Sequence, residues 1–480
     1  MLNSYPHQIE SLKFALTHPR CALLLDMGLG KTKVDIDHSF MLWSKGRIKT
    51  WLIVCPLSVM DVWVDELHKH AQVEEYNLVT IYGSRLKREK LFFLLSELIE
   101  SSDAKLVIGI INYDAVVAFY EELVKVSWTK ITCDESTKIK NARTRRSKAV
   151  FKLAETLQVP YRSILTGTIM TETIQDTFSQ YKFLDPSVFG VIFWRFKATY
   201  LVMGGYGGYE IVGYRNLADF NVRLRSRAII FKAKDCLQLP AVTTQVRRIP
   251  LHADQQKIYN QMKKEAIVEI QEFICGSPPM QSVAPYVLTK IIRLNQITDG
   301  FLKMEDGSIT TLPRSAKMDE LAELLDDLVK EGRKIIIWAR FIKSLDLIST
   351  LLANRRVAYG RLDGTVSKKT RDDYISDFKL PNGSKVLVGQ PRTGGWGLNL
   401  TEATVAIYYS NEYSAEARLQ SEKRIHRIGQ MYPVLYVDLV AKGTVDEVIL
   451  QMLNGKQRLT NIIMDAVKTG DNSKIESLFV

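Results

Sequence analysis

Short apolar runs rich in β-branched residues recur along the chain in two series, and this repetition limits the possible folds more than any other feature. The runs lie at 51–55, 106–111, 131–133 and 163–165, and again at 335–338, 386–388, 405–409 and 434–439. Polar or amphipathic stretches separate them, so each run is expected to form a buried strand followed by a helix. The alternation predicts an α/β protein with two mostly parallel sheets in tandem.

The stretch between the two series lacks this alternation. It contains a segment rich in aromatic residues and glycine at 200–216 and a run of helical pattern at 253–274. We therefore predict an N-terminal lobe at 1–184, a mixed and helical insertion with linker at 185–314, and a C-terminal lobe at 315–480.

Charge and composition narrow the class of partner. The 480 residues include 65 Lys and Arg against 53 Asp and Glu, a net charge of +12, which favours a polyanionic partner and nucleic acid first. No apolar run reaches the roughly 18 residues of a membrane span, and the N-terminus lacks the pattern of a signal peptide, so we expect an intracellular, soluble chain. The five cysteines form no C-x-x-C pair, so neither a zinc site nor a disulfide framework is expected, and the thiols should be reduced and mostly buried.

Residues 23–32, LLLDMGLGKT, resemble a phosphate-binding loop that has Leu25 at its first glycine position. The loop keeps glycines that let backbone N–H groups face phosphate oxygens, the Lys31 ammonium for the β- and γ-phosphates, and the Thr32 hydroxyl for Mg²⁺. The apolar run at 21–25 and a predicted helix at 32–43 supply the strand–turn–helix context that such a loop needs. The alternative is a glycine-rich turn without a ligand.

Two carboxylates follow the predicted strand at 131–133. Asp134 would hold Mg²⁺ through water, and Glu135 would orient and deprotonate the attacking water. Alternatively, both residues cap a helix that begins near Ser136. Together with Lys31 on the neighbouring strand–turn–helix unit, the catalytic interpretation is favoured.

These and further segments resemble the Swi/Snf-type branch of the second helicase superfamily, the DNA-translocating ATPases, nearly end to end. In that family the nucleotide loop normally lacks its first glycine. The N-terminal half offers an adenine-reading segment at Tyr5-Pro6-His7-Gln8, motif Ia at Pro56-Leu57-Ser58 with Trp63 and Glu66, motif Ib at Asn112-Tyr113, DESTKIKN at 134–141 and SILTGTIMTETIQD at 163–176. Thr137 replaces the usual His, and Ile169 and Glu172 replace Pro and Asn.

The resemblance continues through the second half. The segments that resemble the family's brace between the lobes are Leu224-Arg225, Lys234-Asp235 and Leu239-Pro240. Residues 393–400 resemble motif V, and QSEKRIHRIGQ at 420–430 resembles motif VI. The resemblance implies that Arg424 and Arg427 reach the γ-phosphate across the cleft between two RecA-like lobes. The alternative is two surface arginines on a solvated helix.

The resemblance also implies roles for individual residues. The expected catalytic residues are Lys31, Asp134, Glu135, Arg424 and Arg427. The expected nucleotide contacts are Gln8, Met27, Gly28, Leu29, Gly30, Lys31, Thr32, Gly397 and Gln420, and Thr32 and Asp134 would hold Mg²⁺. The expected nucleic-acid contacts are Ser58, Asn112, Tyr113, Arg143, Arg145, Tyr206, Tyr209, Tyr214, Thr393 and Asn399. Arg143 and Arg145 belong to a basic run. The alternative interpretation of this run is a solvated charge cluster that does not contact DNA.

The expected activity is ATP-dependent translocation on, or unwinding of, duplex, forked or branched DNA by a monomer in the cytoplasm. Compact forms of this kind resemble helicases of bacteriophages, which would place the chain in the host cytoplasm, and fork-remodelling members. The alternatives are an RNA helicase of the D-E-A-D type and an ATP-switched nucleic-acid clamp.

The segment at 200–220 predicts one further element. Glycine pairs followed by a β-prone run at 209–214 favour a projecting hairpin. Gly213 and Asn216 match a G-x-x-N pattern of the fork-remodelling subfamily. Tyr206, Tyr209 and Tyr214 would then stack on bases at a junction, or else pack on the first lobe as part of a surface loop.

Overall fold

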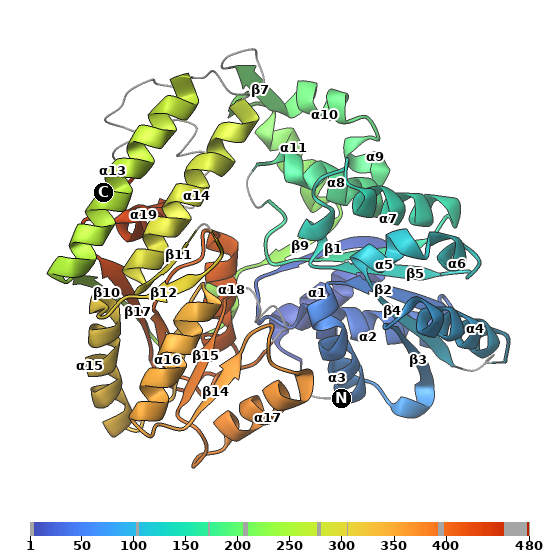
Figure 1. Ribbon diagram of the computed structural model, residues 1–480. Helices are drawn as coiled ribbons and strands as arrows, with labels where there is room; N and C mark the ends of the chain where they lie inside the picture. Colours follow the sequence, from blue (N-terminus) through green and yellow to red (C-terminus); the bar gives the residue numbers. More distant parts are fainter. Residues whose placement is uncertain are drawn as a thin grey trace. The chain divides into compact units, whose positions relative to one another are not determined.

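The structure is a computed structural model of the 480-residue chain (Figure 1). It describes residues 4–101, 105–170, 173–204, 210–275, 280–304, 306–391, 398–455 and 478–479. The chain divides into two compact units, Met1–Gln238 and Leu239–Val480, and each is described by itself. The division falls within 185–314, so the first part of that segment belongs to unit 1 and the remainder to unit 2.

Unit 1 is built on a seven-stranded sheet whose described strand pairs are all parallel. In sheet order, the strands are β3 (Tyr76–Ile81), β4 (Leu106–Asn112), β2 (Thr50–Cys55), β5 (Lys130–Asp134), β6 (Tyr161–Leu165), β1 (Arg20–Leu25) and β9 (Ala228–Phe231). The helices are α1 (Pro6–Thr17), α2 (Lys31–Ser44), α3 (Met60–His70), α4 (Arg85–Ser101), α5 (Tyr113–Ala118), α6 (Tyr120–Val124), α7 (Arg145–Thr156) and α8 (Gln175–Leu184), with 3₁₀ turns at Leu57–Val59, Val73–Glu75 and Ser136–Ile139.

The two faces of this sheet use alternate residues of each strand, as the period of two in a strand requires. Leu52 and Val54 of β2 lie in a core with residues of α5, α6, α7 and α8. Trp51, Ile53 and Cys55 of the same strand lie in a second core with residues of α1, α2 and α3. Because both faces are covered, the strand is an uninterrupted apolar run.

A small substructure follows α8 in unit 1. It consists of α9 (Pro186–Phe189), α10 (Phe193–Tyr200), the antiparallel strands β7 (Leu201–Gly204) and β8 (Glu210–Tyr214), and α11 (Leu217–Arg225). The predicted hairpin is therefore present, and Tyr214 is 41% exposed. Tyr206 and Tyr209 lie outside the described residues. Helix α12 (Ala233–Cys236) follows β9 and packs in the core that contains residues of α1, α2 and α3.

Unit 2 contains a six-stranded sheet whose described pairs are also all parallel. In sheet order, the strands are β10 (Val242–Ile249), β17 (Val434–Ala441), β16 (Val405–Tyr408), β13 (Ile335–Trp338), β15 (Val386–Gly389) and β14 (Tyr359–Leu362). Ile335 and Ile337 of β13 pack with α15 (Ala316–Lys330) and α16 (Ile342–Asn354). Ile336 and Trp338 pack on the other face with α17 (Lys368–Lys379) and α18 (Ala415–Ile425).

Two long helices lie in the chain between β10 and the other strands of this sheet. Helices α13 (Ala253–Cys275) and α14 (Met280–Thr298) lie side by side, and α14 shares an apolar core with α19 (Val445–Gly455) (Figure 1). A short hairpin of β11 (Phe301–Lys303) and β12 (Ile309–Thr311) follows α14.

The predicted fold class, two parallel α/β lobes in tandem, is confirmed by these sheets. No described helix is long and apolar enough to cross a membrane. Of the cysteines whose side chains the structure describes, Cys21, Cys55 and Cys133 are buried and Cys236 is half-buried, all as free thiols.

Candidate nucleotide site and nucleic-acid motifs

Three consecutive strands of unit 1, β5, β6 and β1, bring the predicted nucleotide motifs to one edge of the sheet. Because the strands are parallel, the loops after their carboxyl ends lie together. Strand β6, with the loop at 166–168, lies between the phosphate loop and the acidic pair. A Cβ built on Gly167 would lie 3.4 Å from the backbone nitrogen of Met27, so the loop after β6 touches the phosphate loop directly.

The phosphate loop has the backbone that its glycines predict. Gly28 and Gly30 have φ angles of +88° and +80°, in the left-handed region that favours glycine. Gly30 is the N-cap of α2, and no side chain caps this helix end. The first amides of α2 are therefore open to an anion at the positive end of the helix dipole. Lys31 is the first helical residue, and Thr32 follows it.

The predicted adenine-reading segment is bound to this loop. The Gln8 side-chain amide donates to the Leu29 carbonyl at 3.1 Å, and Nε2 of His7 lies 3.0 Å from the same oxygen. Oε1 of Gln8 accepts from the Tyr5 backbone N–H at 3.1 Å. A Cβ on Gly30 would lie 2.4 Å from Nε2 of Gln8, so this position has no room for a side chain. Gln8 thus supports the loop, and its contact with adenine stays a prediction.

The base of the loop is held by the segment that follows β9. Asp26 donates its backbone N–H to the Phe231 carbonyl at 3.0 Å, and its carboxylate accepts the Ala233 N–H at 3.0 Å. Lys232 forms an ion pair with the same carboxylate at 3.3 Å. These bonds attach the phosphate loop to residues between two parts of the expected brace, a connection that the sequence patterns did not indicate.

Asp134 is fixed by three hydrogen bonds at the end of β5. Its Oδ2 accepts Nε1–H of Trp63 at 2.8 Å, its Oδ1 accepts the Glu135 N–H at 2.9 Å, and its backbone carbonyl accepts the Tyr113 hydroxyl at 2.7 Å. Burial raises the pKa of the Asp134 carboxyl, while the nearby Lys31 charge and the Trp63 bond lower it. Glu135 is half-buried and has φ 47° and ψ 54°, a left-handed conformation that is uncommon outside glycine and marks functional loops.

These residues fit a nucleotide with a bound metal better than a metal alone. Within the described ranges, no group of three or more His, Cys, Asp or Glu side chains could hold a metal ion. Mg²⁺ with few protein ligands and phosphate oxygens in its shell is the usual arrangement in phosphoryl-transfer sites. Thr32 and Asp134 have the hydroxyl and the carboxylate that the sequence prediction assigns to Mg²⁺, and this assignment stays a prediction.

A buried polar cluster lies beneath α2 and was not predicted. Asp35 follows Lys31 by one helical turn, and its Oδ1 accepts from the Lys130 ammonium at 2.8 Å, with both side chains fully buried. Oδ2 of Asp35 accepts the Thr132 hydroxyl at 2.7 Å, and Lys130 also donates to Ser39 at 2.6 Å. The cluster joins the phosphate-loop helix to the strand that ends in Asp134. In the sequence, this cluster shows only as a lysine at the first residue of the apolar strand β5.

The loops after β5 and β6 share one side-chain bridge. Gln180 of α8 is fully buried, accepts the Ser136 hydroxyl at 2.6 Å and donates to the Ile169 carbonyl at 2.8 Å. The bridge therefore links the acidic segment to the segment at 163–176, at Ile169, where the latter departs from the family pattern. Glu172, the other departure, lies outside the described residues.

Motif VI of unit 2 separates into internal and accessible side chains. Arg424 is 5% exposed, donates to the Pro391 carbonyl at 3.1 Å and lies 5.3 Å from the centroid of the Trp338 ring, and burial lowers its pKa to about 10. Gln430 donates to the Thr401 and Ala403 carbonyls at 3.0 and 2.9 Å. Both side chains are therefore engaged inside unit 2.

Arg427 and Gln420, by contrast, are half-buried and reach the surface of this unit. Helix α18, which carries Gln420 and ends two residues before Arg427, is anchored by Arg418, another residue that the motifs did not indicate. The Arg418 guanidinium pairs with both carboxylate oxygens of Asp438, at 2.5 and 3.0 Å, and lies 3.4 Å from the centroid of the Tyr408 ring.

The predicted nucleic-acid contacts differ in their exposure. Arg143, Arg145, Tyr214 and Asn399 are exposed, and Ser58 is half-buried beside Leu57, which is 52% exposed. Asn112 is 8% exposed and Tyr113 only 3%. Tyr113 lies inside unit 1 with its hydroxyl bonded to the Asp134 backbone carbonyl, and the nucleic-acid contacts of Asn112 and Tyr113 stay predictions. Thr393 and Gly397 lie outside the described residues.

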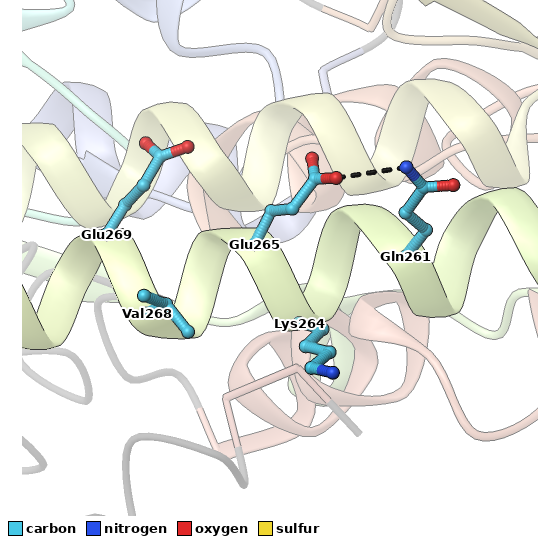
Figure 2. A pocket seen from close by; sticks show the side chains of 5 residues that line it. All are labelled: Gln261, Lys264, Glu265, Val268 and Glu269. Atoms are coloured by element: carbon cyan, nitrogen blue, oxygen red, sulfur yellow. Dashed lines mark hydrogen bonds between the residues drawn. The ribbon is translucent and has the colours of Figure 1, made fainter.

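A hollow on α13 lies apart from these motifs along the chain. Figure 2 shows its lining, Gln261, Lys264, Glu265, Val268 and Glu269, with Gln261 donating to Glu265 at 3.0 Å. All five residues belong to one helix, and none was a predicted site residue.

A phosphate loop at the start of α2 and an acidic pair at the end of β5 define a nucleotide-binding protein of the phosphate-loop class. The comparisons with known proteins specify the family. The SNF2-related domain matches residues 7–299, and the helicase conserved C-terminal domain matches residues 316–429. The chain belongs to the SNF2-related family.

The curated proteins to which the chain is similar are longer than the chain itself. The chain is 28% identical over 95% of its length to "Putative ATP-dependent helicase/translocase YwqA" of Bacillus subtilis (strain 168), covering 48% of that protein. It is 25% identical to Chromodomain-helicase-DNA-binding protein 1-like of Danio rerio, over 96% of this chain and 44% of that one. It is 26% identical to DNA excision repair protein ERCC-6 of Homo sapiens, over 92% and 30%. The chain thus spans half or less of the length of these curated relatives.

A solved structure, the Sulfolobus solfataricus SWI2/SNF2 ATPase core in complex with dsDNA, matches with a TM-score of 0.43 and 24% identity. The match covers 100% of this chain and 98% of that one.

Proposed function

We propose that the chain hydrolyses ATP and uses the energy to translocate on double-stranded DNA. One observation carries the proposal: the open N-terminus of α2, Lys31 and the Asp134–Glu135 pair lie at one edge of the unit 1 sheet. Family membership supports the same activity, and the names of the relatives associate it with DNA.

Each residue of unit 1 then has a chemical task. The α2 amides and the Lys31 ammonium bind the β- and γ-phosphates, and Thr32 and Asp134 hold Mg²⁺. The metal neutralises charge on the phosphates when it is bound. Glu135 takes the proton of the attacking water from its position in the turn after β5.

Unit 2 contributes charge through motif VI. We assign the phosphate-facing role to Arg427, because its side chain is accessible on unit 2. An arginine in this role stabilises charge on the transferred phosphoryl group and is worth about 10³ to 10⁵ in rate. Arg424 would have to leave its bond to Pro391 to act in the same way, so we assign it to supporting the end of β15.

Grip on DNA would be independent of base sequence. The side chains that can face DNA phosphates are the exposed Arg143, Arg145 and Asn399, and Ser58 beside Leu57. Contacts with phosphates fix the register and orientation of a protein on DNA without reading the bases. The β7–β8 hairpin, with Tyr214 exposed, is our candidate for engaging forked or branched DNA. Strand separation, branch migration and fork remodelling are finer proposals that depend on this hairpin.

Three substitutions test the ATP site, and each should impair a different step of binding or hydrolysis. Lys31→Ala is expected to weaken nucleotide binding and abolish turnover, and Glu135→Gln should bind ATP but not hydrolyse it. Arg427→Ala should bind nucleotide and DNA yet lower kcat about 10³-fold.

Lys45→Ala is the control, because this exposed lysine caps the other end of α2. Turnover of Glu135→Gln at the wild-type rate would eliminate the proposed general base. Loss of nucleotide binding in Arg427→Ala would move that residue from catalysis to binding.

A further inference from the structure

Two of the three hydrogen bonds that fix Asp134 come from segments matched to DNA-binding motifs. Trp63 belongs to motif Ia and donates to the carboxylate at 2.8 Å. Tyr113 belongs to motif Ib and donates to the backbone carbonyl at 2.7 Å. The residue assigned to Mg²⁺ is therefore held from two sides by the elements assigned to DNA.

Trp63 connects the surface to the metal ligand over a short path. The exposed Leu57 and half-buried Ser58 form the 3₁₀ turn that leads into α3, and Trp63 lies on the first turn of that helix. Its indole is 1% exposed and packs edge-to-face against Trp51, with ring centroids 5.9 Å apart and an interplanar angle of 83°. A displacement of the turn would move the indole N–H, because the ring has no free volume in which to adjust.

The second connection is shorter still. Asn112 ends β4 and caps α5, and Tyr113 is the next residue. Asn112 is 8% exposed, and its Oδ1 has no hydrogen-bond partner within the described part of the chain. A buried amide oxygen without a partner is costly unless a ligand or water satisfies it. A group that binds Asn112 would act one residue from the Tyr113 hydroxyl.

A purely structural role predicts something different. A phenylalanine at position 63 would fill most of the same volume, and a core-filling residue would not need its N–H to face a carboxylate. Trp128 provides the comparison within the same unit. It is 2% exposed, and its N–H donates at 3.1 Å to the Leu123 carbonyl and not to a residue assigned to the nucleotide site.

We propose that Trp63 and Tyr113 are positioning residues that set the Asp134 carboxylate for Mg²⁺ and transmit DNA contact at motifs Ia and Ib to the ATP site. The inference rests on the proposed function and names the route by which DNA regulates that site. Residues that orient a metal ligand typically contribute 10- to 100-fold in metal affinity.

The experiment compares Trp63→Phe, Tyr113→Phe and the matched control Trp128→Phe. Each variant removes one buried donor and keeps an aromatic ring. Two quantities are measured: the Mg²⁺ concentration that half-saturates binding of a fluorescent ATP analogue, and the fold-stimulation of ATP hydrolysis by duplex DNA. The first needs no turnover.

Trp63→Phe is expected to raise the half-saturating Mg²⁺ concentration at least about 10-fold. Tyr113→Phe should raise it less, because its bond is to the carbonyl. Both variants should lose most of the stimulation by DNA, and excess Mg²⁺ should restore nucleotide binding but not the stimulation. Trp128→Phe should match the wild type in both measurements.

Wild-type Mg²⁺ dependence and DNA stimulation in a folded Trp63→Phe variant would overturn the inference. An equal loss in Trp128→Phe would do so as well, because it would show a general effect of core damage. If Trp63→Phe does not fold, Tyr113→Phe decides by the same two measurements. Failure of the proposed function is distinguishable, since the wild-type protein would then show no stimulation to lose.

Discussion

Removing Lys130 should destabilise unit 1 strongly, because it leaves a carboxylate buried without its cation. The Lys130→Met substitution keeps a long, unbranched side chain but removes the ammonium. The hydrogen bonds of that ammonium to Asp35 at 2.8 Å and to Ser39 at 2.6 Å are lost with it. Burial acts to raise the pKa of Asp35, but the charges of Lys130 and His38 and their hydrogen bonds together outweigh it and hold the pKa below its usual range. Breaking one partner of such a fully buried pair costs about 3 to 5 kcal/mol.

That cost is large against the roughly 5 to 15 kcal/mol by which domains are stable. The assay is urea unfolding followed by tryptophan emission, because buried Trp51 lies 4.9 Å from the Lys130 ammonium and reports on this region. The double variant Asp35→Asn with Lys130→Met removes both charges and should recover much of the loss.

Arg85→Met is the control. Arg85 and Glu89 form an ion pair at 3.0 Å whose side chains are 81% and 42% exposed, so its loss should change the free energy of unfolding by less than about 1 kcal/mol. The reasoning fails if Lys130→Met costs no more than this control, or if the double variant is no more stable than the single one.

Three further predictions follow from particular residues. Gly30→Ala should abolish ATP binding, measured by titration, because Gly30 has φ +80° and the new Cβ would lie 2.4 Å from Nε2 of Gln8; retained affinity would show that the loop adjusts. Burial lowers the pKa of His38 to about 4 from an unfolded value near 6.5, so the free energy of unfolding should fall as the pH drops through that window, by up to about 3 kcal/mol. This part of the pH dependence should be absent in His38→Gln, and equal slopes in the two proteins would contradict it. Replacing residues 204–214 with a Gly-Ser linker should preserve DNA-stimulated ATP hydrolysis and abolish unwinding of forked DNA; if both survive, the hairpin has no role in strand separation.

The strands that the sequence predicts are the interior strands of both sheets. Runs such as 51–55 and 335–338 are buried on two faces and hydrogen-bonded on two sides, which requires continuous apolar residues. The unpredicted strands β3, β9, β10 and β14 are the sheet edges. Strand β10 shows the reason: nearly all of its side chains are exposed, yet it pairs with β17 along its whole length through backbone bonds. Backbone pairing of this kind leaves no apolar pattern.

The candidate site also has one part that the sequence predicts and another part that it does not. Residues of the phosphate loop and the acidic pair are recognisable because the chemistry needs those residue types in a short local pattern. The partners of Asp134 and Asp35 come from distant segments: Trp63 lies 71 residues from Asp134, and Lys130 lies 95 residues from Asp35. Spacing alone does not identify such pairs. Tyr113 is predicted to contact DNA because Asn112-Tyr113 resembles motif Ib, but the resemblance does not reveal that its hydroxyl is bonded to the Asp134 carbonyl.

The most direct test of the account is ATP turnover by the wild-type protein without nucleic acid, with duplex DNA and with RNA, over a range of salt concentrations. The account predicts strong stimulation by duplex DNA that falls steeply as salt rises, because phosphate contacts release counterions. RNA should stimulate poorly, and Glu135→Gln should show no turnover under any condition. Equal stimulation by RNA would favour an RNA helicase, and nucleotide-dependent DNA binding without hydrolysis would favour a clamp; either result would contradict the proposed DNA translocase.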